Sequence, residues 1–289
     1  MTATIRALSW AGDVRVAAVA ASVVAGAVAA GLMAAWARDR AGDRGAVASV
    51  GLWCLWPSSV VLSMAYSEAL FCAAVAGCLL AMQRGRWWWA ATTCALAGLT
   101  RPTGAALLVA LVVGVVLARA GWRRSVPVVA LASTGLLVSL GHVAVVTGRW
   151  DGWLWLQATV WRGGFDAGRS FWSVVQDVLT GGRAAQVPTY VVAVAAAAGA
   201  LVLLLALLRS RPPAREVVYT VGALLMGLGG AAYAHVKPRF LLVALPLFVE
   251  PGRWVARVPR PLVWVCGLIL LALSARWSAY LLAEWPYSV

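Results

Sequence analysis

Long apolar runs recur along the whole of this 289-residue chain, and they constrain its fold more than any other feature. A helix needs about 20 apolar residues to cross the hydrocarbon core of a membrane. Hydrophobic residues make up 63% of the sequence and charged residues only 12%, unlike a soluble domain. We therefore predict an all-α, polytopic transmembrane bundle of about nine to ten membrane segments. The expected spans are 14–36, 47–65, 67–83, 87–100, 104–118, 125–146, 188–208, 217–235, 240–250 and 262–283.

Two of these spans, 87–100 and 240–250, are short, and each lies beside a charged motif. Irregular backbone at membrane depth is tolerated only where it is buried in protein or lines a cavity. The two spans are therefore predicted to be broken or partial spans that line a cavity. The whole chain, 1–289, is expected to form a single integral membrane domain.

Arginines gather in short loops between the apolar runs, which accounts for the net charge of +14 without a nucleic-acid partner. Alternate threading of the spans puts all of these loops on one side, which the positive-inside rule makes cytoplasmic. We predict a multi-pass plasma-membrane protein that contacts membrane lipids, with residues 1–13 outside. Because an outside N-terminus without a signal is unusual, the threading also suggests a preceding helix. The loops are 38–44, 84–86, 119–124, 209–215 and 253–260.

The long segment 147–187 falls on the opposite, external side and is rich in tryptophan. Tryptophan favours the membrane–water interface, so an interfacial helix is expected over 150–161. Asp151 and Asp166 in this segment are candidate general bases. Each also suits the ordinary role of a turn residue.

Glu68 and Arg101 are charged residues that the same threading places at the external end of apolar runs. Glu68 either belongs to a helix start capped by Ser67 or faces a cavity, where an acid marks a functional site. In a cavity it would orient Arg101 or contact a substrate, and we include it among the candidate catalytic carboxylates. Arg101 precedes Pro102, which breaks the helix. It either extends to the interface or binds a phosphate near the next helix start.

The motif "AHVKPRF" brings three cationic or potentially cationic side chains, His235, Lys237 and Arg239, to this same external end. One interpretation is interfacial positioning, and the other is a site for an anion. Lys237 and Arg239 are suited to holding a phosphate, and His235 to hydrogen bonding or proton transfer. Arg276, toward the outer end of the last span, is expected to join them. Such a cavity suits a lipid-linked phosphate, with its polyprenyl tail in the bilayer.

The sequence contains no zinc motif, glycine-rich phosphate loop or Ser–His–Asp spacing. Its five cysteines lie within or beside apolar runs, where they are expected to be small core residues. We therefore predict neither a metal site nor a cofactor.

Several segments together resemble a known family. They are "WPSSVVLSMAYSEALF", "AGLTRPTG", "TGRWDGWLWLQATVWRGGFDAG" and "HVKPRFLLVALPLF", between about residues 47 and 250. In this order they resemble the PIG-V-type mannosyltransferases, of the GT-C class of membrane glycosyltransferases. The resemblance implies a GT-C-like fold. It also implies transfer of a sugar, commonly mannose, from a polyprenyl-phosphate donor to a lipid or protein acceptor outside the cytoplasm. By motif position, Arg101, Lys237 and Arg239 would hold the donor phosphate.

The chain departs from that family at its start. The family begins with one more helix and an external loop whose aspartate is the expected base, and Asp13 does not reproduce that pattern. Two other functions therefore stay open. One is a non-catalytic membrane protein or subunit of the same fold. The other is a transporter of an anionic or lipid-linked substrate, which broken helices with intramembrane charges would also suit.

Overall fold

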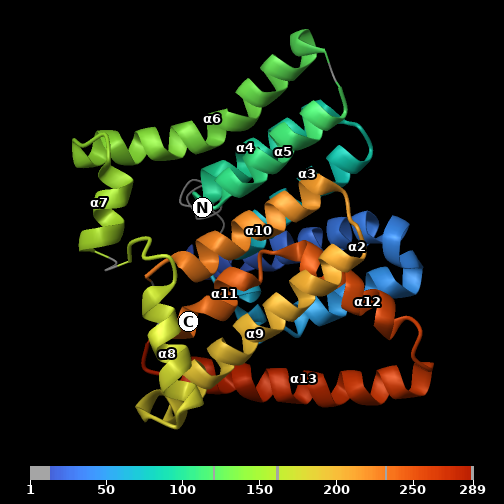
Figure 1. The fold of residues 1–289 in the computed structure, drawn as a ribbon, viewed down its shortest axis with the longest axis vertical. Helices are drawn as coiled ribbons and strands as arrows, with labels where there is room; N and C mark the ends of the chain where they lie inside the picture. Colours follow the sequence, from blue (N-terminus) through green and yellow to red (C-terminus); the bar gives the residue numbers. More distant parts are fainter. Residues whose placement is uncertain (1–13, 120, 161–162, 232, 288–289) are drawn as a thin grey trace.

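The computed structural model describes residues 14–119, 121–160, 163–231 and 233–287, so the expectation for residues 1–13 lies outside them. The described residues are helical, with no strand beyond one isolated bridge between Phe165 and Gly230 (Figure 1). The predicted all-α fold is confirmed. The helices in chain order are α2 (Val14–Cys54), α3 (Glu68–Gln83), α4 (Trp87–Thr100), α5 (Gly104–Leu117), α6 (Trp122–Thr147), α7 (Gly152–Thr159), α8 (Arg169–Leu179), α9 (Pro188–Arg209), α10 (Ala214–Gly229), α11 (Lys237–Leu241), α12 (Val249–Val255) and α13 (Arg260–Ala283).

Helix α2 consists of two arms that meet at Gly42. The backbone of Gly42 has φ 68° and ψ 176°, which a glycine adopts without steric cost. Ser22 on the first arm donates a hydrogen bond to the carbonyl of Tyr66, which follows the second arm, so the chain has turned back by then. The two predicted spans at 14–36 and 47–65 correspond to these arms.

Four helices are long and apolar enough to cross a membrane, namely α2, α6, α9 and α13, while α3 and α5 are shorter apolar helices. Fewer helices are therefore full-length spans than the sequence predicts. The second arm of α2 ends at Cys54 rather than residue 65, because Pro57 follows and the chain continues as the 3-10 turn η2 (Ser59–Ser63). The expected span 240–250 is divided among α11, the 3-10 turn η5 (Leu245–Phe248) and α12.

The broken segment between α11 and α12 is buried, and side chains from other helices satisfy its carbonyl groups. Trp56 Nε1 donates to the Pro238 carbonyl at 2.7 Å and Trp53 Nε1 to the Leu242 carbonyl at 3.1 Å. The Tyr219 hydroxyl donates to the Val243 carbonyl at 2.7 Å. Buried irregular backbone requires such partners. This network fixes the position of α11, which carries Arg239.

Helices α4 and α6 approach each other closely at small residues. A Cβ added to Gly135 would lie 1.7 Å from the Ala95 carbonyl oxygen, and one added to Gly98 would lie 2.6 Å from the Leu136 nitrogen. Glycine at such crossings lets two backbones come into contact. The corner that follows is also tight, because a Cβ on Gly152 would lie 2.0 Å from Thr147 Oγ1. The α4–α6 contact thereby positions α7.

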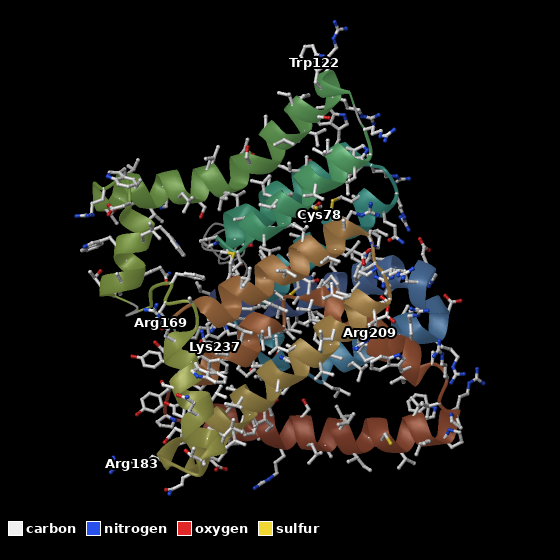
Figure 2. All side chains as sticks on the ribbon, in the orientation of Figure 1. Cys78, Trp122, Arg169, Arg183, Arg209 and Lys237 are labelled. Carbon is white, nitrogen blue, oxygen red and sulfur yellow. The ribbon has the colours of Figure 1, made fainter. Side chains whose placement is uncertain are left out.

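The predicted arginine-rich loops gather at one end of the bundle, drawn at the right of Figure 1, while α7 and α8 lie at the other. Hydrogen bonds connect several of these loops, including Gln83 Nε2 to Asp39 at 2.6 Å and Arg44 to the Val258 carbonyl at 3.2 Å. Figure 2 places Arg209 at this end and Arg169, Arg183 and Lys237 at the opposite end. We call the two ends the arginine-rich end and the loop end. The helix expected over 150–161 is present as α7, and α8 is an additional helix that the sequence analysis did not anticipate.

Candidate functional site

Glu68, Arg101 and Arg239 come together at the loop end, from three separate segments. Glu68 is the first residue of α3, and the Ser67 side chain forms no cap hydrogen bond there. Arg101 follows α4 in an extended conformation (φ −154°, ψ 143°), as expected for a residue that precedes proline. Arg239 lies in α11, directly after Pro238. We call these three residues the loop-end triad.

Glu68 Oε1 accepts hydrogen bonds from Arg101 Nη1 and from Arg239 Nε, and Glu68 is fully buried. The side chains of Arg101 and Arg239 are 14% and 16% exposed. Aromatic rings cover both guanidinium groups, since Arg239 lies 4.0 Å from the Tyr66 ring centroid and Arg101 lies 5.5 Å from that of Phe240. Two guanidinium groups thus converge on one buried carboxylate.

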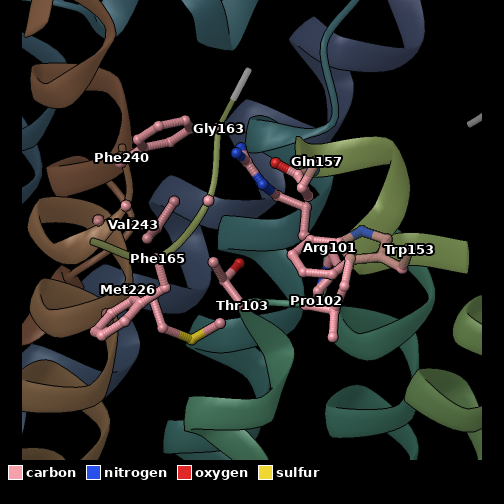
Figure 3. A pocket seen from close by; sticks show the side chains of 15 residues that line it. Arg101, Pro102, Thr103, Trp153, Gln157, Gly163, Phe165, Met226, Phe240 and Val243 are labelled. Atoms are coloured by element: carbon pink, nitrogen blue, oxygen red, sulfur yellow. The ribbon is translucent and has the colours of Figure 1, made fainter. Parts of the chain in front are cut away.

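Arg101, one member of the triad, lines a cavity of about 410 Å³ at the loop end. Arg101 is the charged side chain among the described residues that line it, and Thr103 and Gln157 contribute polar groups. The Thr103 hydroxyl is buried and has no hydrogen-bond partner among the described residues. Figure 3 shows these side chains around the cavity, with Trp153 from α7 and Phe240 from α11. The cavity therefore offers a cation beside an otherwise largely apolar wall.

A second, almost wholly apolar groove of about 670 Å³ lies between α8, α9 and α10. Phe165 lines both this groove and the first cavity. The remaining walls are apolar side chains such as Phe171, Leu201 and Leu224. The cavity beside Arg101 and the apolar groove thus share Phe165 in their walls.

The other predicted cations are placed differently from Arg101 and Arg239. Lys237 is fully buried, and its Nζ donates to the carbonyls of Gly227, Leu228 and Gly230, so it holds the C-terminal end of α10. His235 packs among aromatic rings, including those of Tyr190 and Trp285. Arg276 is exposed on α13, a helix whose buried residue is Leu281. Like Arg239, none of these three is among the described residues that line the cavity.

The two aspartates of the long loop are each held by near neighbours. Arg149 forms two hydrogen bonds to Asp151, at 2.9 and 3.0 Å, and these lower the pKa of Asp151. Asp166 accepts hydrogen bonds from the Ser170 hydroxyl and from the backbone N–H groups of Gly168 and Ser170. The Ser170 hydroxyl is the main cause that lowers the pKa of Asp166. A lowered pKa makes a carboxylate a weaker base, and their catalytic role stays a prediction.

The sequence analysis missed a second buried ionic cluster, at the arginine-rich end. Arg40 donates to Glu216 at 2.5 Å and to Glu250 at 2.9 Å, and Arg253 donates to Glu250 at 2.9 Å. Both glutamates are buried. Each glutamate lies at the end of an apolar run, close in the sequence to an arginine-rich loop. This position was the available signal, because an acid at the end of an apolar run needs a charged partner. We call these four residues the arginine-rich-end cluster.

The sequence matches no protein-family profile and no curated protein sequence. Among solved structures it is similar to ArnT from Cupriavidus metallidurans, which was crystallised with undecaprenyl phosphate. The TM-score is 0.56 at 19% sequence identity, over 92% of this chain and 50% of that protein, so this chain spans about half the length of ArnT. The similarity supports the predicted GT-C architecture. It does not extend to the PIG-V-type family in particular. The chain is thus a helical membrane protein with a GT-C-like fold.

Proposed function

We propose that this protein is a membrane glycosyltransferase that uses a polyprenyl-phosphate sugar as its donor. The observation that carries the proposal is the loop-end triad, in which Arg101 and Arg239 converge on Glu68 and Arg101 lines a cavity of about 410 Å³. A phosphate is the natural partner of two converging guanidinium groups. The apolar groove between α8, α9 and α10 offers the polyprenyl chain a surface continuous with that cavity. The undecaprenyl phosphate bound to ArnT supports the same class of lipid.

In the proposed reaction, the hydroxyl oxygen of the acceptor attacks the anomeric carbon of the sugar. The bond from that carbon to the phosphate oxygen breaks, and the electron pair stays with the phosphate. Arg101 and Arg239 stabilise the charge that develops on this leaving group, as preorganised donors do in a buried site. The acceptor proton passes to a carboxylate, for which Asp151, Asp166 and Glu68 are the candidates in this chain. We propose no metal or cofactor in this reaction.

The finer features of the proposal rest on the sequence motifs. Mannose is the first sugar to test, because the segments around Glu68, Arg101 and Arg239 resemble those of mannosyltransferases. The acceptor is a lipid or a protein, and the proposed place of reaction is the external face of the plasma membrane. Lys237 and His235 would act indirectly here, through the positions of α10 and α11.

A specific observation also favours a non-catalytic protein that binds a polyprenyl phosphate. No carboxylate lines the cavity among the described residues, and Asp151 and Asp166 are both engaged by near neighbours. Such a protein would hold the lipid through the same triad without breaking the sugar–phosphate bond.

The deciding experiment is transfer from labelled polyprenyl-phosphate mannose in membranes that contain the protein, with lipid binding measured on the purified protein in parallel. The Arg101→Ala variant is expected to lose both. Arg183→Ala is the matched control, because Arg183 is an exposed arginine at the same end of the bundle. Wild-type binding without product, across several donor sugars, would favour the non-catalytic protein. Absence of lipid binding by the wild type would contradict both functions.

A further inference from the structure

The cavity at the loop end carries neutral polar groups in addition to its cation. Arg101 is the charged side chain among the described residues that line it, whereas Thr103 and Gln157 are uncharged. Figure 3 draws Gln157 and Trp153, both from α7, on the same side of the cavity as Arg101, with Met226 on the other. The proposed contact with a phosphate uses Arg101 and leaves the neutral groups without a role.

The hydroxyl of Thr103 is buried at the wall of the cavity and lacks a partner. Thr103 is the N-cap residue of α5, but its side chain forms no cap hydrogen bond there. Its Oγ1 atom has no hydrogen-bond partner among the residues that the structure describes. A buried polar group without a partner is destabilising, so its presence calls for an explanation. A ligand in the cavity would supply the missing partner.

The face of α7 that lines the cavity combines an aromatic ring with an amide. Trp153 and Gln157 are four residues apart and therefore lie on the same side of the helix. Both are half-buried and both line the cavity. The amide of glutamine offers two donors and an acceptor, and the face of an indole ring carries partial negative charge. These properties match a sugar, which presents hydroxyl groups at its edge and partly positive C–H groups on its ring faces.

We infer that Thr103, Gln157 and Trp153 form the subsite for the sugar of the donor and determine which sugar is accepted. The inference rests on the proposed function, in which Arg101 holds a phosphate that is bonded directly to that sugar. Thr103 and Gln157 bind sugar hydroxyls, and the ring of Trp153 packs against a face of the sugar. The cavity of about 410 Å³ falls within the range of about 300–1,000 Å³ that is usual for small-molecule sites.

This division of the cavity separates affinity for the lipid phosphate from selectivity for the sugar. A site built to hydrogen-bond a hydroxyl discriminates against a ligand that lacks it, because its own polar groups are then left unpaired. Thr103 and Gln157 carry no charge, so they contribute little to the attraction of a phosphate. Changes at these two residues should therefore alter sugar selectivity and leave binding of the lipid phosphate nearly intact.

The test compares lipid probes of equal charge on the purified protein. One probe is the methyl diester of undecaprenyl phosphate, and the others are its mannosyl, glucosyl and galactosyl diesters. Each carries one negative charge, so the ratio of Kd values between the methyl diester and a glycosyl diester isolates the contribution of the sugar. The wild type should bind at least one glycosyl diester about tenfold more tightly than the methyl diester.

Two variants remove the neutral polar groups, and each carries the test by itself. Gln157→Leu and Thr103→Val should each lower this ratio by about five- to tenfold, while the Kd of the methyl diester stays within about twofold of the wild type. The matched controls are Gln176→Leu and Thr159→Val. Gln176 and Thr159 are exposed at the same end of the bundle and are not among the residues that line the cavity. Both controls should keep the ratio of the wild type.

Thr103 and Trp153 each allow a further check. Thr103→Ser keeps the hydroxyl and should retain the ratio. Thr103→Val should unfold at the same temperature as the wild type or higher in the absence of lipid, because it removes a buried hydroxyl that lacks a partner. A purely structural role would instead lower the unfolding temperature and weaken all probes alike. Trp153→Leu should lower the ratio, whereas Trp153→Phe, which keeps an aromatic face, should retain most of it.

The inference is overturned if the methyl diester binds and no glycosyl diester binds more tightly. It is also overturned if the ratio stays within about twofold of the wild type in both Gln157→Leu and Thr103→Val, or if these variants weaken every probe equally. Failure of the wild type to bind any of the four diesters would contradict the proposed function itself. The methyl diester therefore distinguishes loss of the sugar subsite from loss of the phosphate site.

Discussion

The molecule carries a buried ionic cluster at each end, and the two differ in how their arginines share carboxylates. At the arginine-rich end, Arg40 pairs with both Glu216 and Glu250, and Arg253 also pairs with Glu250. At the loop end, Arg101 and Arg239 both pair with one oxygen of Glu68. Both clusters border open space, since a groove of about 450 Å³ lies beside Glu250 and Arg253. Empty space alone therefore does not distinguish a structural cluster from a binding site.

The comparison also shows what each cluster connects. Arg40 joins the turn of α2 to α10 and α12, and it donates to the Ser210 hydroxyl at 3.0 Å as well. This cluster fastens the ends of several helices. The loop-end triad joins the starts and ends of α3, α4 and α11 around a cavity. We expect the first cluster to govern stability and the second to govern ligand binding.

The largest expected effect is on ligand binding and transfer at the loop end. Arg101→Ala should weaken binding of polyprenyl phosphate, and sugar transfer if it occurs, by about 100-fold, because a buried charged partner of the phosphate is lost. Binding is measured by titration of the labelled lipid on purified protein. Arg253→Ala is the control from the other cluster, and an equal loss of binding there would break the comparison.

The next effect is a loss of stability at the arginine-rich end. Arg40→Ala leaves Glu216 and Glu250 with fewer partners in a buried environment, which should lower the free energy of unfolding by about 3 kcal/mol. Thermal unfolding in detergent measures this change. Protein that remains folded should bind the lipid like the wild type. A variant that stays folded but no longer binds the lipid would contradict the division of roles, in which the arginine-rich-end cluster governs stability and the loop-end triad governs ligand binding.

A smaller loss of stability is expected from Lys237→Met, because this change removes the ammonium donor from the carbonyls at the end of α10. The expected cost is about 1–3 kcal/mol, as for buried acceptors left without a donor. Thermal unfolding and lipid titration on the same samples separate the two roles. If lipid binding falls by as much as in Arg101→Ala while stability is kept, Lys237 belongs to the phosphate site.

The smallest expected effect concerns the loop carboxylates. The pKa values of Asp151 and Asp166 are lowered from the ordinary value of an aspartate, so both groups stay ionised and their titration should not reduce activity between about pH 5 and 8. The Asp166→Asn variant should retain most transfer activity, because the carboxylate mainly holds the first turn of α8. A pH–rate profile of wild type and variant checks this. A loss of about 100-fold in Asp166→Asn would identify Asp166 as the base.

Much of the fold follows from the sequence because hydrophobic length and arginine spacing are local properties. They predict the helices, the turn near residue 42 and the shared end of the arginine-rich loops. The same reasoning places Glu68, Arg101 and Arg239 at one end and offers an interaction between Glu68 and Arg101, which the structure shows. The contact between Glu68 and Arg239 was not predicted, because it depends on how α3 and α11 pack. The expectation of a broken or partial span at 240–250 is confirmed, since the segment is divided at the 3-10 turn that contains Pro246.

Other features depend on partners that the sequence does not display. Lys237 pairs with backbone carbonyls, which every residue carries and no motif marks. Glu216 and Glu250 are buried, although both lie close in the sequence to arginine-rich loops that are expected to face solvent. Helix α8 follows a loop rich in glycine and aromatic residues. That composition favours an irregular segment, so the sequence did not predict a helix there.

The contact of Gly135 with Ala95 has a mechanical consequence for the cavity. Helix α6 rests on α4 at this point, and α7, which carries Trp153 and Gln157 to the cavity wall, is joined to the end of α6 by a tight corner. The close contact at Gly135 therefore sets the orientation of α6 and of the α7 that follows it. A methyl group added at Gly135 would push α6 away from α4. The displacement would be largest at α7, beside the cavity where the ligand would lie. The width of the cavity thus depends on Gly135, a residue that does not line the cavity.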